Sequence, residues 1–253
     1  MMWRLVYASD IGTSHAHSDV QCQDRCWAQV LSLLNRKPLL SIFVSDGAGS
    51  AARGENGAEL AIKTAADFVT KKAMEGEFGL SDILATEIVI TLRERIYAVA
   101  ESQNLSARDF ACTFLGILST DNGTLVLQIG DGGVVVDTGS GLEVAIEPMS
   151  GEYANMTRFV TDDDAVSILA TKTYPDRALK AAVFTDGIQR LALNLATNTP
   201  HLPFFAPFFN GIDKASDEQM GQLNSLLNKF LGSPPVNDRT DDDKTLALAL
   251  WMP

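Results

Sequence analysis

The sequence predicts a layered α+β protein in which β-sheets lie inside and helices cover them. Two observations lead to this prediction. The strand patterns are grouped along the chain instead of alternating with helices, and long helical patterns stand between these groups. With 253 residues, of which 46% are apolar, the chain can build a substantial core. Because no repeat or linker interrupts it, we expect one domain over residues 1–253.

The first part of the chain combines strands with two helices. Runs of aliphatic, β-branched and aromatic residues predict strands over 3–9, 26–34 and 39–45. Apolar residues then recur with helical spacing over 61–69 and again over 81–99. Each apolar stripe is expected to face the core of the protein.

The second part of the chain is rich in strands. The sequence Asp-Asn-Gly at 121–123 is a hairpin signal between two of them. A helical pattern over 216–231 precedes the last strand. The strands are predicted over 112–120, 124–130, 133–138, 142–147, 165–171, 180–185 and 244–251.

The charge balance and the cysteine content limit the partners and the compartment. Twenty basic and 32 acidic residues give a formal net charge of −12, which repels nucleic acid and anionic membranes, so we expect neither as a partner. The first residues lack the pattern of a signal peptide, and no apolar run is long enough to span a membrane. Cys22, Cys26 and Cys112 cannot all pair with one another and complete no four-ligand zinc set. We therefore expect reduced thiols and a cytoplasmic location.

Aspartates recur where the predicted strands begin or end. A single Asp-Gly is more often a turn than a ligand, but a central sheet would bring several of these strand ends to one edge. Carboxylates gathered there would repel one another unless a cation neutralised them. Oxygen ligands favour Mg²⁺ or Mn²⁺ over zinc, so the sequence predicts a polycarboxylate metal site. The aspartates are Asp24, Asp46, Asp131, Asp186 and the run Asp241, Asp242 and Asp243.

Seven motifs in order carry a resemblance to a known family. They are GTSHAHSDVQCQDR, VSDGAGSA, CTFLGIL, IGDGG, GEYANMTRFVT, VFTDG and DDDKTLAL. From about residue 5 to residue 250 the chain resembles the bacterial protein phosphatase 2C-like proteins of the metal-dependent PPM family. The resemblance implies an α+β fold made as a four-layer α-β-β-α sandwich, with two antiparallel sheets flanked by helix pairs.

The resemblance also implies a function and a role for each acid. The function is hydrolysis of phosphoserine and phosphothreonine monoesters in proteins by a water that bridges two Mg²⁺ or Mn²⁺ ions. Asp46 and Asp186 would be the catalytic residues, acting through that water. As metal ligands, the resemblance implies Asp46 as the bridge with the Gly47 carbonyl beside it, Asp186 and Asp242 at the first ion, Asp24 through water at the second, and Asp131 sharing a third, weaker ion with Asp186.

The residue that grips phosphate is not fixed by the resemblance. Many relatives place an arginine a few residues before the first acid, whereas this chain has Asp19 near that place. His15, Arg25 and Arg53 are the candidates for phosphate binding, and each is weighed against an ordinary surface side chain.

Two further departures leave alternatives open. Ala48 stands where eukaryotic relatives carry a histidine that is a candidate general acid, so a water, His15 or another residue would have to protonate the leaving group. Gln23 replaces the acid beside Asp24, which would weaken the hold on the second ion. The alternatives to a protein phosphatase are a catalytically silent phosphoprotein-binding scaffold with the same fold and a phosphatase of small molecules.

The surface offers three weaker signals. The segment GEYANMTRFVT leads into a flap-like segment around 148–175, which would select among phosphorylated protein substrates of a monomeric enzyme. The aromatic run 201–209 is expected to pack in the core rather than to form a partner surface, with His201 structural. The run 162–164 is expected to be solvated charge.

Overall fold

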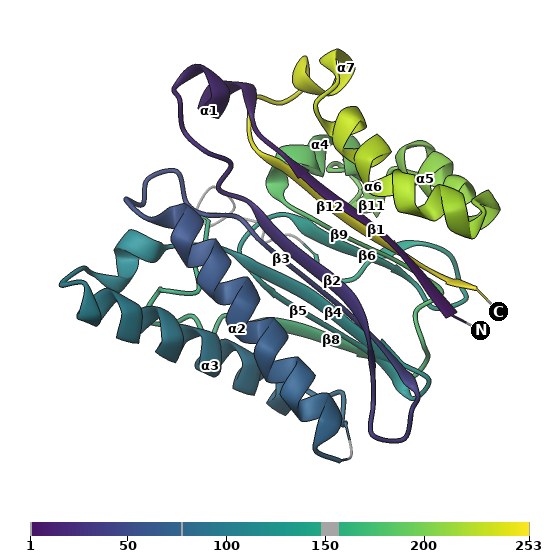
Figure 1. Ribbon diagram of the computed structural model, residues 1–253, viewed down its shortest axis with the longest axis horizontal. Helices are drawn as coiled ribbons and strands as arrows, with labels where there is room; N and C mark the ends of the chain where they lie inside the picture. The colour runs from purple at the N-terminus through teal and green to yellow at the C-terminus, as the bar shows by residue number, and fades with distance from the viewer. Residues whose placement is uncertain (1, 77, 148–156, 253) are drawn as a thin grey trace.

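The computed structural model describes residues 2–76, 78–147 and 157–252. Two five-stranded antiparallel sheets stack on each other, and helices cover the outer face of each sheet (Figure 1). The predicted α+β class and four-layer sandwich are therefore confirmed.

The first sheet joins the two ends of the chain. Its strand order is β1-β12-β9-β6-β7, and its outer face is covered by α5 (Leu202–Lys214) and α6 (Asp217–Leu231). The side chain of Ser216 caps α6 by accepting a hydrogen bond from the backbone N–H of Gln219. The strands are β1 (Met2–Asp10), β12 (Lys244–Met252), β9 (Lys180–Phe184), β6 (Gly133–Asp137) and β7 (Glu143–Val144).

The second sheet comes from the middle of the chain. Its order is β2-β3-β4-β5-β8, and α2 (Gly54–Met74) and α3 (Asp82–Ser102) cover its outer face. The predicted Asp-Asn-Gly hairpin joins β4 to β5, where Gly123 adopts the positive φ of 142°. The strands are β2 (Arg25–Ser32), β3 (Pro38–Ser45), β4 (Phe114–Thr120), β5 (Gly123–Ile129) and β8 (Ala170–Tyr174).

The alternation of side chains along the buried strands explains why four layers form. On β3, Phe43 packs against the helices α2 and α3, whereas its neighbours Ile42 and Val44 pack between the two sheets. All three side chains are fully buried. A third cluster, with Phe184 and Phe205, fills the space between the first sheet and α5 and α6. Each strand of this kind is buried on both faces and so reads as a continuous apolar run.

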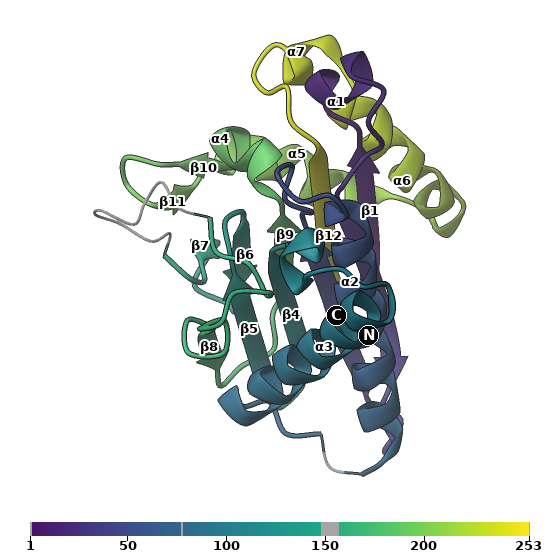
Figure 2. The ribbon, with the colours of Figure 1, turned by 90° about the vertical axis from the view of Figure 1, so that its left-hand side faces the viewer.

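The short elements gather at one end of the sandwich. Figure 2 shows α1 and α7 together at the end of β1 and β12 that lies away from the two chain termini. None of the helices in the described part of the chain is both long and apolar enough to cross a membrane. The short elements are α1 (Thr13–His17), η1 (Ala107–Phe110), η2 (Asp186–Ile188), α4 (Gln189–Ala192), β10 (Leu193–Asn194), β11 (Thr199–Pro200) and α7 (Pro234–Asn237).

Two strand predictions were wrong in position. The segment predicted as a strand over 165–171 forms turns, and β8 begins only at Ala170. The backbone N–H groups of Ser167 and Ile168 donate to the Asp164 carbonyl, so this apolar stretch forms turns. Its apolar side chains pack against the hydrophobic cluster between the second sheet and the helices α2 and α3. The strand predicted over 142–147 is reduced to the two residues of β7.

The aromatic run forms most of α5. Phe205 and Phe209 are buried, while Phe204 and Phe208 are half-buried and stack edge-to-face on each other. The expectation of core packing is confirmed for the buried pair. His201 is the exposed N-cap of this helix, and its backbone N–H donates to the Ala192 carbonyl.

Candidate metal centre

The strand registers bring the predicted acids to one end of the sandwich. In the second sheet, Arg25 pairs with Ser45. Asp24 directly precedes Arg25 and Asp46 directly follows Ser45, so both acids lie at the same end of these two paired strands. In the first sheet, Phe184 lies between Gly133 and Leu246. Asp131, Asp186 and Asp242 therefore lie just beyond the ends of three neighbouring strands, at that same end of the molecule.

The backbone on both sides of Asp46 is pinned to β4. The Asp46 N–H donates to the Thr113 hydroxyl at 3.0 Å, and the Thr113 N–H donates to the Asp46 carbonyl at 2.8 Å. At Gly47 a Cβ atom would lie 2.3 Å from the backbone of Gly54, so only glycine allows the loop to pass under the start of α2. Sequence and packing together fix where the Asp46 carboxylate points.

The Asp46 carboxylate is the electrostatic centre of the cluster. Burial raises its pKa well above the ordinary value, and the charges of four other carboxylates raise it further. These are, in decreasing order of effect, Asp24, Asp186, Asp242 and Asp131. The other four predicted ligand carboxylates therefore all act on Asp46.

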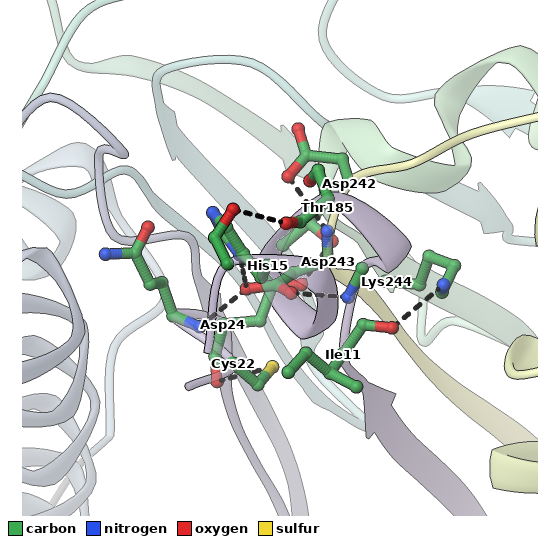
Figure 3. Close-up of polar contacts among 12 residues, drawn as sticks. Ile11, His15, Cys22, Asp24, Thr185, Asp242, Asp243 and Lys244 are labelled. Carbon is green, nitrogen blue, oxygen red and sulfur yellow. Dashed lines mark hydrogen bonds and ion pairs between the residues drawn. The ribbon is translucent and has the colours of Figure 1, made fainter. Parts of the chain in front are cut away.

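Asp24 is fully buried and only half satisfied. Its Oδ2 accepts a hydrogen bond of 2.7 Å from the Thr185 hydroxyl, whereas its Oδ1 is buried with no hydrogen-bond partner among the described residues (Figure 3). Burial raises the pKa of Asp24 to about 7, and the charges of Asp243 and Asp186 add to the effect. The neighbouring Gln23 also has a buried, unpartnered oxygen, Oε1. A buried acceptor without a donor, such as the Asp24 Oδ1, is what a cation or its water shell would satisfy.

Asp186 and Asp131 interact electrostatically. Burial raises the pKa of Asp186 to about 7, with Asp131 and Asp242 as the next causes. Asp131 lies in the turn between β5 and β6, flanked by Gly130 and Gly132 at φ values of 98° and 101°. Its Oδ2 accepts a hydrogen bond of 2.7 Å from the hydroxyl of Thr157.

Asp242 completes the set at the start of β12. Its Oδ1 accepts a hydrogen bond of 2.8 Å from the N–H of Asp243, which orients the carboxylate. Burial is the largest cause that raises the pKa of Asp242, whereas the charge of His15 lowers it. The predicted ligand Asp242 is thus distinct in its surroundings from Asp241, which is exposed.

These residues fit a site for hard divalent cations. The donors are carboxylate oxygens, and burial combined with mutual repulsion disfavours their charged forms unless a cation is shared. Within the described ranges, no three Asp, Glu, His or Cys side chains stand close enough together to be a finished coordination shell.

The three phosphate candidates differ in how far they are already engaged. Arg25 donates to the carbonyls of Cys22 and Asp24 at 2.7 and 2.8 Å and forms an ion pair with Glu55. Its guanidinium therefore holds the loop before β2 against α2. Arg53, at the N-terminus of α2, is exposed and its side chain makes no hydrogen bond or ion pair to any described residue.

His15 is held inward from α1. Its Nδ1 lies 3.0 Å from Oδ2 of Asp243, without the alignment of a hydrogen bond, and its side chain is 21% exposed. Figure 3 shows His15 in the same cluster as Asp24, Asp242 and Asp243.

Sequence reasoning missed the residues that support the acids. Thr113, Thr185 and the buried Asp243 lie within the quoted motifs, but their supporting role is not visible in the sequence, because their partners lie far away in the chain. Of the predicted flap over 148–175, residues 148–156 lie outside the described residues, whereas 157–169 form irregular and turn structure that leads into β8. In the run 162–164, Asp163 and Asp164 are exposed, whereas Asp162 accepts a hydrogen bond from the N–H of Phe159.

The fold and the carboxylate-rich end define a class of protein, a four-layer α-β-β-α sandwich whose oxygen donors at one end suit divalent cations. Residues 11–232 match the protein phosphatase 2C family, and the chain belongs to that family. It is 59% identical over 251 residues to serine/threonine-protein phosphatase 3 of Escherichia coli strain K12, and the match covers 99% of each chain. The predicted family and enzyme class, a serine/threonine protein phosphatase, are confirmed.

Solved structures share the fold at low sequence identity. Serine/threonine phosphatase Stp1 from Staphylococcus aureus superposes with a TM-score of 0.65 at 12% identity, over 100% of this chain and 96% of that chain. The catalytic domain of the serine/threonine protein phosphatase PstP, solved with two manganese ions, gives a TM-score of 0.60 at 18% identity over 98% of both chains. These likenesses support the four-layer architecture.

Proposed function

We propose that this chain hydrolyses phosphoserine and phosphothreonine monoesters in proteins with two Mg²⁺ or Mn²⁺ ions bound at the strand-end aspartates. The observation that carries the proposal is the gathering of five carboxylates at one end of the sandwich, with Asp24 buried and the other four half-buried, and with the Asp24 Oδ1 left without a donor among the described residues. The proposed ligands are Asp24, Asp46, the Gly47 carbonyl, Asp186 and Asp242, with Asp131 and Asp186 sharing a third, weaker ion.

The chain's own residues would divide the work between the two sheets. When bound, the ions supply Lewis acidity that activates a water molecule and compensates phosphoryl charge. Asp46 comes from the second sheet and Asp186 from the first, so a shared site would span the interface between the sheets. Thr113 fixes the Asp46 backbone, and Thr185 fixes one oxygen of Asp24. Arg53 is the free guanidinium that would reach the phosphate.

The remaining parts of the proposal concern partners and place. The protein would act as a monomer in the cytoplasm, as one domain, on phosphorylated proteins. The net charge of −12 requires that bound cations reverse the field locally before a phosphate dianion can approach. Catalysis would therefore depend strictly on the divalent ion.

The test is the isosteric variant Asp46→Asn. It should lower Mn²⁺-stimulated hydrolysis of p-nitrophenyl phosphate and of a phosphothreonine peptide by about a thousandfold, because metal activation is worth several kcal/mol. Circular dichroism should show an unchanged fold. Asp241→Asn is the matched control, since it removes one exposed charge nearby and should keep full activity.

Other outcomes would identify the alternatives. Full activity in Asp46→Asn would contradict the proposal. Tight Mn²⁺ binding by calorimetry without turnover of any phosphopeptide would instead indicate a silent phosphoprotein-binding protein. Turnover of small phosphate esters but of no phosphoprotein would indicate a small-molecule phosphatase.

A further inference from the structure

Asp243 is not among the proposed metal ligands, yet both oxygens of its carboxylate accept hydrogen bonds from backbone N–H groups at this end of the molecule. It is 2% exposed and sits between the proposed ligand Asp242 and the fully buried Lys244. Its Oδ1 accepts a hydrogen bond of 2.6 Å from the N–H of Gly12, and its Oδ2 accepts one of 2.6 Å from the N–H of Gln23. Figure 3 shows Asp243 together with His15, Asp24 and Asp242.

Each of these bonds reaches a different part of the proposed centre. Gln23 directly precedes Asp24, so its N–H sets the position of the loop that carries that carboxylate. Gly12 begins the turn into α1, which carries His15. The His15 ring then returns to the same carboxylate, with Nδ1 3.0 Å from Oδ2.

The backbone around Asp243 is packed too closely for these loops to shift independently. A Cβ atom at Gly12 would lie 2.4 Å from the carbonyl oxygen of Asp241, and one at Gly187 would lie 1.9 Å from the carbonyl oxygen of Asp243. Gly187 follows Asp186 directly, so the loop with that acid also rests on Asp243.

Lys244 secures the same region from the other side. Its Nζ, fully buried, donates to the Ile11 carbonyl at 3.1 Å and to Oδ1 of Asn237 in α7 at 2.8 Å. It lies 3.9 Å from Oδ2 of Asp10. The turn between β1 and α1 is therefore held at Ile11 by Lys244 and at Gly12 by Asp243.

We propose that Asp243 is the positioning residue of the metal centre, whose two carboxylate oxygens fix the loops of Asp24 and His15 against the strand that carries Asp242. The proposal rests on the proposed function, because it concerns the same site. A carboxylate is needed, since N–H donors face both of its oxygens, whereas an asparagine amide would turn an NH₂ group toward one of them. Residues that orient metal ligands in this way commonly cost about 10- to 100-fold in metal affinity when replaced.

The experiment compares Asp243→Asn with Asp241→Asn. Both variants remove one negative charge from the same run, but the Asp241 side chain is exposed and makes no hydrogen bond or ion pair to any described residue. Calorimetric titration should show Mn²⁺ binding weakened by about 10- to 100-fold in Asp243→Asn and by less than about twofold in Asp241→Asn. In steady-state kinetics, the Mn²⁺ concentration for half-maximal activity should rise by the same factor. At saturating Mn²⁺, kcat should recover to within a few-fold of the wild type.

A purely structural role would give a different pattern. Asp243→Asn would then lower the melting temperature in EDTA while leaving the Mn²⁺ affinity within about twofold of the wild type, and that result would overturn the proposal. An equal loss of Mn²⁺ affinity in Asp241→Asn would also overturn it, since charge alone would then explain the effect. Metal binding is measured without turnover, so failure of this inference and failure of the proposed catalysis are separate results.

A second measurement needs no variant. In wild-type protein, hydrogen exchange followed by mass spectrometry should show the amides of Gly12 and Gln23 becoming more protected when Mn²⁺ is added, together with the start of β12. Exchange at these two amides that does not respond to Mn²⁺ would contradict the proposed coupling.

Discussion

The Thr185 hydroxyl donates a hydrogen bond of 2.7 Å to Oδ2 of Asp24 and accepts one of 3.0 Å from the N–H of Thr245. One side chain thus joins β9, β12 and the first acid of the centre, entirely within buried surroundings. The other oxygen of Asp24 has no partner among the described residues. The Thr185 hydroxyl therefore links the Asp24 carboxylate to the first sheet.

Replacement of Thr185 by valine should show how much its hydrogen bond to Asp24 contributes to stability. The shape of the side chain is kept, but a buried carboxylate loses its donor, so we expect the free energy of unfolding to fall by about 1–3 kcal/mol in EDTA. Urea unfolding would measure the change, and Thr185→Ser, which retains the hydroxyl, is the matched control. Equal stability of the valine and serine variants would show that the bond contributes nothing.

The raised pKa values of the acids predict how the metal-free protein responds to pH. The pKa values of Asp24 and Asp186 are raised from the ordinary value of 3.8 to about 7. Between pH 3.8 and about pH 7 the folded protein binds more protons than the unfolded chain. The free energy of unfolding is therefore largest at the acidic end of this pH range and falls as the pH rises. In EDTA the melting temperature should accordingly be higher near pH 6 than near pH 8.

Divalent ions should counteract this pH dependence of the melting temperature. Because cations compete with protons for the same carboxylates, Mn²⁺ should raise the melting temperature more near pH 8 than near pH 6. Differential scanning fluorimetry across this range would measure both effects, and Asp186→Asn should reduce the pH dependence in EDTA. A melting temperature in EDTA that rises between these two pH values would contradict the assigned direction.

A contact remote from the centre provides a test of the fold alone. The Arg4 side chain of β1 donates to the carbonyls of Ile212 and Ala215, at 2.9 and 2.6 Å, where α5 ends. It also pairs with Asp217 at the start of α6 at 3.3 Å. Its guanidinium satisfies carbonyls that the helix end leaves without partners.

Arg4→Met should therefore destabilise the protein without affecting the metal centre. We expect a loss of about 1–3 kcal/mol in the free energy of unfolding, with unchanged Mn²⁺ affinity. Lys63→Met is the control, because it removes a cation from an exposed pair with Glu59 and should change stability by less than about 0.5 kcal/mol. Loss of Mn²⁺ affinity in Arg4→Met would show that the helix pair and the centre are coupled.

The sequence predicted most of the fold because its apolar periodicity follows the layers closely. The strand around Phe43 and the stripes of α2 and α3 are apolar where they are buried. The wrong strand prediction over 165–171 has the same origin. Ala165, Ile168 and Leu169 are packed against the core, but they reach it from turns, and an apolar run alone does not distinguish a buried turn from a strand.

The candidate site was predictable only in its acids. Asp46 and Asp186 are recognisable because each follows an apolar strand and precedes a glycine. The support given by Asp243 could not be predicted, since it arises from contacts with Gly12 and Gln23, which lie 231 and 220 positions away in the chain. The pairing of β1 with β12 brings Gly12 to Asp243, and the packing of the second sheet against the first brings Gln23 there.

The different engagement of Arg25 and Arg53 gives a prediction about substrate binding. Arg53 is exposed beside the loop of Asp46, so Arg53→Ala should raise KM for a phosphothreonine peptide by about tenfold and leave kcat nearly unchanged. Arg25 already holds the carbonyls of Cys22 and Asp24. Arg25→Ala should instead weaken Mn²⁺ binding and lower stability, because the loop before β2 loses its anchor.

Steady-state kinetics at saturating Mn²⁺, paired with calorimetric titration of the metal, separates these two roles. Arg53→Lys should recover part of the lost affinity for the peptide, since the positive charge remains while the paired geometry of the guanidinium is lost. A rise in KM confined to Arg25→Ala, with Arg53→Ala unchanged, would assign the phosphate to Arg25. It would also mean that the ion pair of Arg25 with Glu55 opens when substrate binds.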